Sequence, residues 1–270
     1  TVSNGVPAIT VKLHLVGFLL LGTLASQGLG AATCPLHNHG NLAVIIDDLG
    51  YNLDTAQVAA AIPAPLTMSI IPGTPYALEV ADLGAKRGKE VMLHMPMAAV
   101  RTRVSDPLVL DGQLPVADIG QRVQQALQSV PGAAGMNNHM GSALTTNREA
   151  MDALMSELAA QDMFFIDSRT TAETVARDAA KARGVPSASR TVFLDNKPEL
   201  AAVEIQIKEA VRRALVEGYA IAIGHPHPAT LTALSRALPR LPADVTVVSA
   251  SQIARCHENH RRTSMPRAAR

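Results

Sequence analysis

Carboxylate, amide and imidazole side chains recur directly after short β-favouring runs of this 270-residue sequence. Six such clusters follow runs of this kind: Asp47-Asp48, His94, Asn137-Asn138-His139, Asp167-Ser168-Arg169, Asp195-Asn196 and His225-Pro226-His227. If the runs are parallel strands, their carboxyl ends lie on one face of the fold, where loops assemble active sites. We therefore predict that Asp48, His94, His139 and His225 converge on one metal-centred hydrolytic site.

Two adjacent carboxylates and several imidazoles suit a divalent ion such as zinc, which takes oxygen and nitrogen ligands and can leave one position open for water. A second carboxylate beside that water can accept its proton, and an imidazole can protonate the leaving group. Taken singly, an Asp after a strand often caps a helix, and a lone His is more often packed than ligating. The coincidence of six clusters at one sheet edge is what predicts a site. Adjacent strand residues point to opposite sides, so Asp47 and Asp48 can share the site only where the strand gives way to a loop.

The elements that must position these residues are predicted from apolar runs that alternate with helical patterns. Runs of the kind that parallel sheets bury on both faces predict eight strands, at 42–46, 67–71, 90–93, 134–137, 163–166, 191–194, 220–223 and 245–248. Helical patterns lie between them, for example at 75–87, 116–129, 148–160 and 199–217, and Thr146-Asn147 is a capping signal for the third. This order predicts an α/β protein with a parallel sheet, either closed into a barrel or open and doubly wound. Seven to eight strands favour an irregular (β/α) barrel over residues 41–250.

The two ends of the chain are predicted to lie outside this domain. Lys12 precedes an apolar run and a small-x-small cleavage pattern, so residues 1–32 are predicted to be a signal peptide, with 1–10 upstream of the natural start. This predicts a periplasmic or secreted protein without stable membrane insertion after cleavage; an uncleaved N-terminal anchor is the alternative. Residues 255–270 are predicted to be a disordered basic tail. Cys34 and Cys256 either form a disulfide that joins the ends of the domain or remain free thiols.

Composition argues against a nucleic-acid partner. The formal net charge is +1, and aromatic residues make up 3% of the chain. There is therefore no global field to attract a polyanion and little aromatic surface on which bases could stack. Residues 95–115 carry three prolines and no clear periodicity, and they are predicted to form a long connection that either shapes a cleft or stays on the surface.

Several ordered motifs together resemble the divergent polysaccharide deacetylase family. They are Ile45-Ile46-Asp47-Asp48-Leu49-Gly50, Leu93-His94-Met95-Pro96-Met97, Asn137-Asn138-His139-Met140-Gly141-Ser142, Phe165-Ile166-Asp167-Ser168-Arg169-Thr170 and Gly224-His225-Pro226-His227-Pro228. The resemblance implies a polysaccharide deacetylase-like (β/α) barrel that uses a divalent metal, zinc by expectation, to remove acetyl groups from an envelope or extracellular glycan. Two further functions stay open: a catalytically inactive glycan-binding protein, or a metal-dependent hydrolase of another ester in which Arg169 clamps an anion.

The resemblance also implies roles for individual residues. Asp47 matches the catalytic base, Asp48 and His94 match metal ligands, and His225 matches the general acid. The sequence departs from the family pattern at Ala98, where a second metal histidine is usual, and it has no Arg-Pro-Pro-Tyr motif. From strand-end geometry we expect His139 to complete the metal ligands. The predicted substrate-binding residues are Asn138, Asp167, Arg169 and His227.

Overall fold

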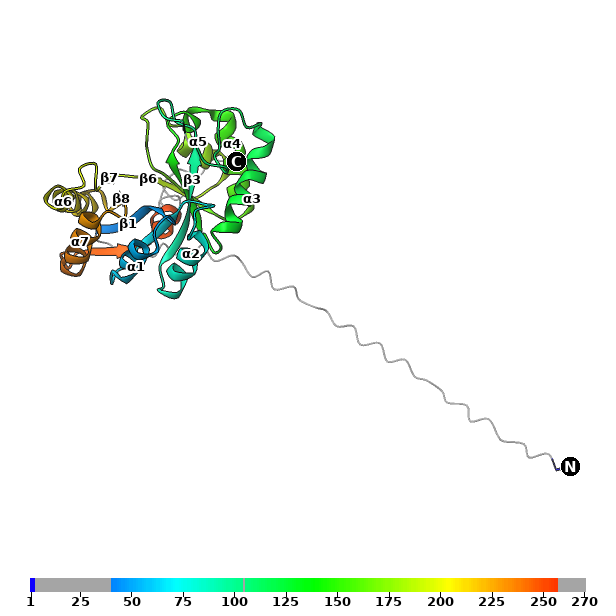
Figure 1. Cartoon of the computed structure of the whole chain (residues 1–270), viewed down its shortest axis with the longest axis horizontal. Coiled ribbons are helices and arrows are strands. Elements are labelled where there is room, and N and C mark those ends of the chain that lie inside the picture. Colours follow the sequence, from blue (N-terminus) through cyan, green and yellow to red (C-terminus); the bar gives the residue numbers. More distant parts are fainter. Residues whose placement is uncertain (3–39, 104, 257–270) are drawn as a thin grey trace, which may run out of the picture. The chain divides into compact units, whose positions relative to one another are not determined.

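The computed structural model describes residues 1–2, 40–103 and 105–256, in which strands and helices alternate along the chain (Figure 1). The strands are β1 (Gly40–Leu49), β2 (Thr67–Ile70), β3 (Glu90–Met97), β4 (Gly135–Met140), β5 (Phe164–Asp167), β6 (Ser187–Ser189), β7 (Val192–Phe193), β8 (Tyr219–Gly224) and β9 (Val245–Val248). The helices are α1 (Leu53–Ala61), α2 (Ala77–Lys86), α3 (Ile119–Ser129), α4 (Arg148–Ala160), α5 (Ala176–Arg183), α6 (Leu200–Glu217) and α7 (Pro228–Ala237).

The strands form one curled parallel sheet in the order β6-β5-β4-β3-β2-β1-β8-β7, and β9 pairs with the first residues of β1. The two ends of this order, β6 and β7, are consecutive in the chain. Between them, the backbone N–H of Arg190 donates to the carbonyl of Asp167 at the end of β5, and the N–H of the next residue, Thr191, donates to the carbonyl of Ile221 on β8. One kinked segment therefore joins the two edges of the sheet, which confirms the predicted α/β barrel-type fold.

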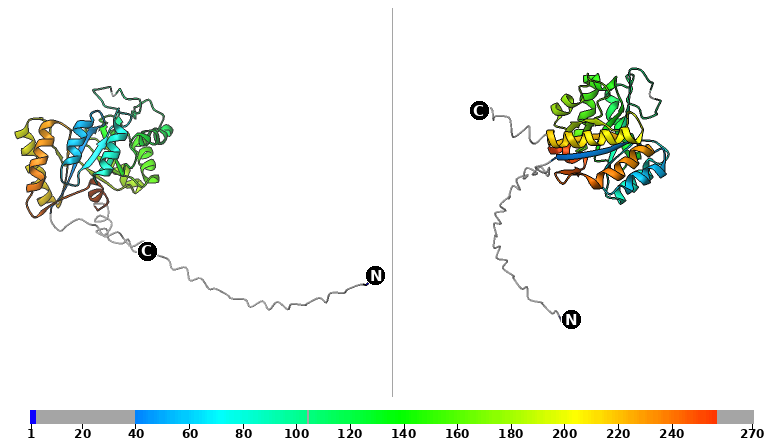
Figure 2. Two further views of the ribbon diagram at one scale, coloured as in Figure 1. Left: turned by 60° about the horizontal axis from the view of Figure 1, so that its bottom comes forward. Right: turned by 90° about the vertical axis from the view of Figure 1, so that its left-hand side faces the viewer.

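Alternating residues of the strands face two different layers. On β1, Leu42, Val44 and Ile46 pack in the large cluster that includes the helices, whereas Ala43 and Ile45 pack in a small cluster inside the curled sheet. The helices cover the outer layer: Figure 2 shows α6 lying along β1. That contact needs Gly40, because a Cβ there would lie 2.9 Å from the backbone carbon of Ala214. The period of two thus divides each strand between helix packing and the barrel interior.

All eight predicted strands and the four predicted helices are present. However, β1, β3 and β4 run three to four residues further than predicted, so Asp47, Asp48, His94 and His139 lie within strands rather than after them. The N-cap of α4 is also as expected, since the side chain of Asn147 accepts a hydrogen bond from the backbone N–H of Ala150. The short β6, of sequence Ser-Ala-Ser, was not predicted, because three small residues give no apolar run. The long connection after β3 is held to the sheet by a bridge between Met97 and Leu110.

The predicted basic tail begins later than expected. Residues 250–256 are helical, and Arg255 donates to the side chain and the carbonyl of Asp162. Ile253 and Ala254 pack in the interior cluster, so this helix closes the end of the barrel at which the strands begin. Cys256 is buried and disulfide-bonded. Cys34, the rest of the tail and nearly all of the predicted signal peptide lie outside the described residues.

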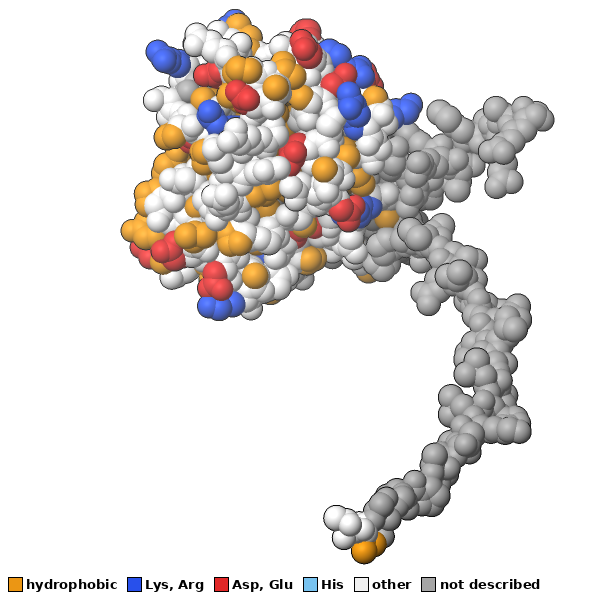
Figure 3. All heavy atoms as spheres, turned by 90° about the vertical axis from the view of Figure 1, so that its right-hand side faces the viewer, with side chains coloured by type: hydrophobic (Ala, Val, Ile, Leu, Met, Phe, Trp, Pro, Cys, Tyr) orange, Lys and Arg blue, Asp and Glu red, His pale blue; other side chains and the backbone are white. Residues whose placement is uncertain are grey.

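The surface shows no single dominant charge on the face seen in Figure 3, where acidic and basic side chains are interspersed. Among the helices that the structure describes, none is both long and apolar enough to cross a membrane.

Candidate functional site

A β-bulge brings Asp47 and Asp48 to the same site. Ile46 pairs with Met68 and Leu49 pairs with Ile70, so two residues of β1 stand opposite one residue of β2. Asp47 keeps the inward alternation of β1, whereas Asp48 would point outward in a regular strand. Instead, Asp48 has a left-handed backbone (φ 56°), which Asp tolerates better than most residues. Both residues lie within β1, so a bulge inside the strand, rather than the predicted transition from strand to loop, brings them to one site.

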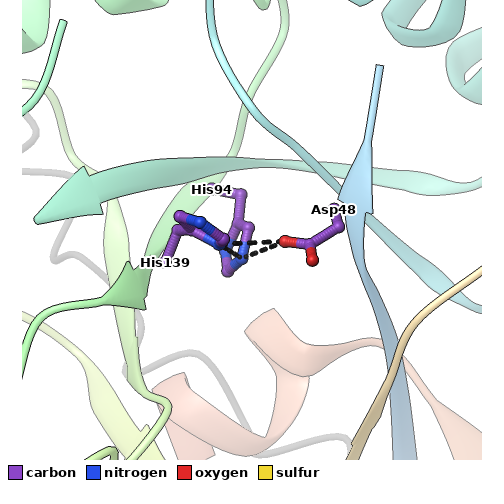
Figure 4. A group of neighbouring side chains, drawn as sticks. All are labelled: Asp48, His94 and His139. Carbon is purple, nitrogen blue, oxygen red and sulfur yellow. Dashed lines mark hydrogen bonds and ion pairs between the residues drawn. The ribbon is translucent and has the colours of Figure 1, made fainter. Parts of the chain in front are cut away.

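Asp48 on β1, His94 on β3 and His139 on β4 point their ligand atoms at one another across the inside of the sheet (Figure 4). Oδ1 of Asp48 lies 3.1 Å from Nε2 of His94 and 2.9 Å from Nδ1 of His139, and the two ring nitrogens are 3.2 Å apart. That carboxylate oxygen is buried, and despite its two neighbours it has no partner in hydrogen-bond geometry among the described residues. The three atoms thus share one small space.

Asn137 orients the ring of His94. Its amide oxygen lies 2.6 Å from Nδ1 of His94 and accepts from the hydroxyl of Ser69, while its amide nitrogen donates to Oδ1 of Asp47. Because Asp47 can only accept, the amide orientation is fixed, and Nδ1 of His94 must be the donor to the amide oxygen. In the neutral ring the other nitrogen, Nε2, therefore carries the lone pair, and it faces Asp48 and His139.

The charges at this site are strongly coupled. Burial acts to lower the pKa of His94, but the carboxylates of Asp47 and Asp48 outweigh it and raise that pKa to about 9. Burial likewise acts to raise the pKa of Asp48, yet the two imidazoles hold it well below its usual range. In the absence of a metal, a proton on an imidazole thus compensates the carboxylate charge.

These residues fit a divalent metal. A tetrahedral ion about 2.1 Å from each ligand holds two ligand atoms about 3.4 Å apart, close to the distances between the three atoms here. One carboxylate and two imidazoles are also a usual donor set for a catalytic ion, with a position left for water. Three ligand atoms lie within 3.2 Å of one another, and the buried Asp48 oxygen meets neither imidazole in regular hydrogen-bond geometry; this crowding favours a metal over an ordinary polar cluster.

His225 forms a hydrogen-bonded pair with Asp195. Oδ1 of Asp195 lies 3.0 Å from Nδ1 of His225, and Oδ2 accepts from the backbone N–H of His225 and the hydroxyl of Thr230. Gly224 permits this approach, because a Cβ there would lie 3.2 Å from the same carboxylate and 3.0 Å from Thr230. Burial acts to lower the pKa of His225, but Asp195 and Asp48 raise it above its usual value.

The pairing with Asp195 leaves Nε2 of His225 facing the metal-ligand candidates, 3.7 Å from Oδ2 of Asp48. A cationic imidazole held in this way can donate a proton. Asp195, His225 and the exposed His227 also bring ligand atoms within 4.8 Å of one another. The hydrogen bonds already made by Asp195 favour the proton-donor arrangement over a second ion.

A cavity of about 790 Å³ opens over these side chains. Of the predicted site residues, it is lined by Asp47, Asp48, His94, Asn138, His139, Arg169 and His225. The side chain of Asn138 links β4 to the loop after β5, because it accepts a hydrogen bond from the N–H of Ser168 and donates one to the carbonyl of Met140.

Asp167 and His227, both predicted to bind substrate, do not line the cavity. Asp167 has the outward alternation of Phe165, and its carboxylate accepts from the N–H of Arg169 and the hydroxyl of Thr174. It therefore fixes the loop after β5. His227 is exposed and stands just before α7.

Sequence reasoning assigned no role to Asn137, Asp195 or Arg190. Asn137 and Asp195 stood in the strand-end clusters, so their positions were visible while their partners were not. Arg190 lines the cavity from the connection between β6 and β7. The sequence gives no signal for it, because β6 was not predicted.

The family model for divergent polysaccharide deacetylases matches residues 44–254. The chain belongs to this family. An uncharacterised protein of Haemophilus influenzae is 39% identical over 247 residues, which cover 92% of this chain and 86% of that protein. The uncharacterised protein YibQ of Escherichia coli is 36% identical over 214 residues, covering 79% of this chain and 67% of YibQ.

Solved structures agree with this assignment at the level of the fold. The uncharacterised protein ATU2773 of Agrobacterium tumefaciens superposes with a TM-score of 0.74 at 19% identity, covering 80% of this chain and 89% of that one. The T48 deacetylase, solved with substrate, gives a TM-score of 0.50 at 13% identity, covering 80% and 90%. The curled parallel sheet is thus of the polysaccharide deacetylase type.

Proposed function

We propose that this protein is a metal-dependent hydrolase that removes acetyl groups from a glycan of the cell envelope. The observation that carries the proposal is the convergence of Asp48, His94 and His139. Their three ligand atoms lie 2.9 to 3.2 Å apart, and one of them, Oδ1 of Asp48, is a buried oxygen without a partner in regular hydrogen-bond geometry. Family membership supports the acetylated glycan as substrate. Zinc is the metal that this donor set favours.

When bound, a divalent ion would polarise water and the acyl oxygen of the substrate. Asp47 is the base: its Oδ1 accepts from Asn137, and Oδ2 remains to accept a proton from water in the cavity. His225 is the acid: its Nδ1 is held by Asp195, and Nε2 donates a proton to the leaving amine or alkoxide. The water adds to the acyl carbon, the bond to the sugar nitrogen or oxygen breaks, and acetate is released.

The test combines elemental analysis of the purified protein with acetate release from chitin-like and peptidoglycan-derived oligomers. We expect about one divalent ion per chain and acetate release in the wild type. His139→Ala should lose the ion, and Asp47→Asn should keep the ion and lose turnover. Asp54→Asn, an exposed carboxylate on α1, is the matched control and should keep both.

Two results would contradict the proposal. Full metal occupancy in His139→Ala would refute the ligand set. A metal-loaded wild type that binds these oligomers without releasing acetate would instead identify a glycan-binding protein.

We further propose that the protein acts in the periplasm or after secretion. The disulfide at the buried Cys256 supports an oxidising compartment, since such bonds are rare in a reducing cytosol. Fractionation of cells that express the full-length chain tests this; recovery with cytosolic markers would contradict it.

A further inference from the structure

The cavity has a second polar region, formed by arginines. Besides the metal-ligand candidates it is lined by Arg169, Arg190, Arg213 and Glu209. Arg213 is paired, because its Nε lies 2.9 Å from Glu209 and its Nη1 lies 3.6 Å from Glu217. Arg169 and Arg190 form no ion pair with any residue that the structure describes, and they supply the uncompensated positive charge of this region.

The guanidinium of Arg190 is held in place by the protein, and one of its three nitrogens has no hydrogen-bond partner among the described residues. Its Nε donates to the carbonyl of Ser168 at 2.7 Å, and its Nη2 donates to the carbonyl of Arg169 at 3.0 Å. The guanidinium also lies 5.1 Å from the ring centre of Phe193. Within the described part of the chain, Nη1 makes no hydrogen bond. An orientation set by two carbonyls and a ring is the kind of pre-organisation that binds an oxyanion well.

Arg169 is held in place through its backbone rather than its side chain. Its backbone is left-handed (φ 49°), its N–H donates to Asp167, and its carbonyl accepts from Arg190. The guanidinium itself forms no hydrogen bond with a described residue. Backbone strain of this kind is found mainly where function requires it.

The two cations have little compensation from the protein. The nearby carboxylate of Asp167 is occupied by the N–H of Arg169 and the hydroxyl of Thr174. Burial lowers the pKa of Arg190; the charge of Asp167 opposes this, the charge of Arg169 adds to it, and Asp47 acts weakly against it. Ser168 lines the cavity between them, is 6% exposed and has a buried hydroxyl without a partner in the described structure. A negatively charged ligand would compensate the positive charges of Arg169 and Arg190, whereas a neutral glycan would not.

We propose that the glycan bound here is acidic, and that Arg169 and Arg190 bind a carboxylate or phosphate group of it while the acetyl group lies at Asp48, His94 and His139. This inference rests on the proposed function for the position of the acetyl group. It adds a substrate class: an acetylated sugar with an oxyanion on the same or a neighbouring residue.

The test is equilibrium binding by calorimetry, which needs no turnover. The probes are a disaccharide of N-acetylglucosamine and glucuronic acid, neutral diacetylchitobiose, and a phosphorylated diacetylchitobiose. We expect at least one acidic probe to bind about tenfold or more tightly than the neutral one, because hydrogen bonds between charged groups are stronger than neutral ones. The tighter of the two acidic probes identifies the oxyanion.

Variants separate a specific contact from general charge. Arg169→Gln, which removes no hydrogen bond of the protein, should lower the affinity for the acidic probe about tenfold and leave the neutral probe unchanged. Arg190→Lys keeps the charge but loses the planar set of guanidinium N–H donors, and it should bind the same acidic probe less tightly. Arg236→Gln on α7 removes an exposed charge and should change nothing.

Equal binding of acidic and neutral probes would overturn the inference, as would an equal loss of affinity in Arg236→Gln. The inference and the proposed function fail separately. Acetate release from neutral and acidic glycans alike, insensitive to Arg169→Gln, would leave only the deacetylase. Selective binding of acidic glycans without acetate release would leave only the oxyanion site.

Discussion

Nδ1 of His94 lies 2.6 Å from the amide oxygen of Asn137, and this contact turns the opposite ring nitrogen toward Asp48. Asn137→Ala should therefore weaken metal binding about 10- to 100-fold, because it frees the ring and its tautomer. Competition with a chromogenic chelator measures this. Asn196→Ala, in the same cavity but without a hydrogen bond to a ligand, is the control, and equal affinities in the two variants would argue against the role of Asn137.

Metal binding should stabilise the folded protein. The ligand atoms come from three strands, so they meet only in the folded chain, and a ligand at about 100 times its Kd adds about 2.7 kcal/mol by mass action. We expect zinc to raise the melting temperature in scanning fluorimetry and EDTA to reverse the rise. His139→Ala should not respond, and a full response in that variant would exclude His139 as a ligand.

Asp195 should contribute stability that depends on pH. Burial acts to raise its pKa, but its bonds to His225 and Thr230 lower it below the usual value. A lowered pKa in the folded state gives stability that is present above the ordinary Asp pKa of about 3.9 and is lost as the pH falls through the native value. Asp195→Asn should cost about 1–3 kcal/mol at pH 7, since the donors that face it lose an acceptor.

Urea unfolding at a series of pH values measures this effect. Between pH 7 and about 5 the difference between wild type and Asp195→Asn should grow, because His225 takes up a proton whose binding Asp195 favours; below about pH 4 it should shrink, because Asp195 itself is protonated. Asp244→Asn, an exposed carboxylate, is the control. A difference that fails to shrink below about pH 4 would contradict the assigned sign.

Gly135 should not tolerate a side chain. A Cβ there would lie 2.4 Å from the ring of Phe164, which is fully buried. Gly135→Ala should destabilise the protein by about 1–3 kcal/mol, and Phe164→Leu should relieve part of that cost in the double variant. Gly112→Ala, with open space around it, should be nearly neutral. Denaturant unfolding measures the wild type, the two single variants, the double variant and the Gly112→Ala control, and strictly additive costs would contradict the predicted contact.

The strands could be predicted from the sequence because a parallel sheet buries both faces, which leaves long apolar runs. Their carboxyl ends were placed too early in β1, β3 and β4, because polar site residues interrupt the apolar pattern before the strands end. The convergence of Asp48, His94 and His139 follows from those ends. The bulge that turns Asp48 inward depends on how β1 pairs with β2. The sequence indicated only that the alternation of the strand must break there if Asp47 and Asp48 are to share a site.

Other features depend on partners that a single sequence does not reveal. Asp167 was predicted to bind substrate, but the register of β5 points it away from the cavity, toward the side on which Phe165 packs. Asn137 and Asp195 act through hydrogen bonds to residues 43 and 30 positions away. Such second contacts are set by tertiary packing, not by local pattern.

The kinked segment between β6 and β7 connects the two walls of the cleft. Arg190 bonds to the wall that continues β5, and Thr191, the next residue, bonds to the wall formed by β8, which leads into His225. Consecutive residues, about 3.8 Å apart at their Cα atoms, therefore bond to the two walls. An insertion of one residue at this seam would change the separation of the two walls while leaving the metal-ligand candidates on their own strands.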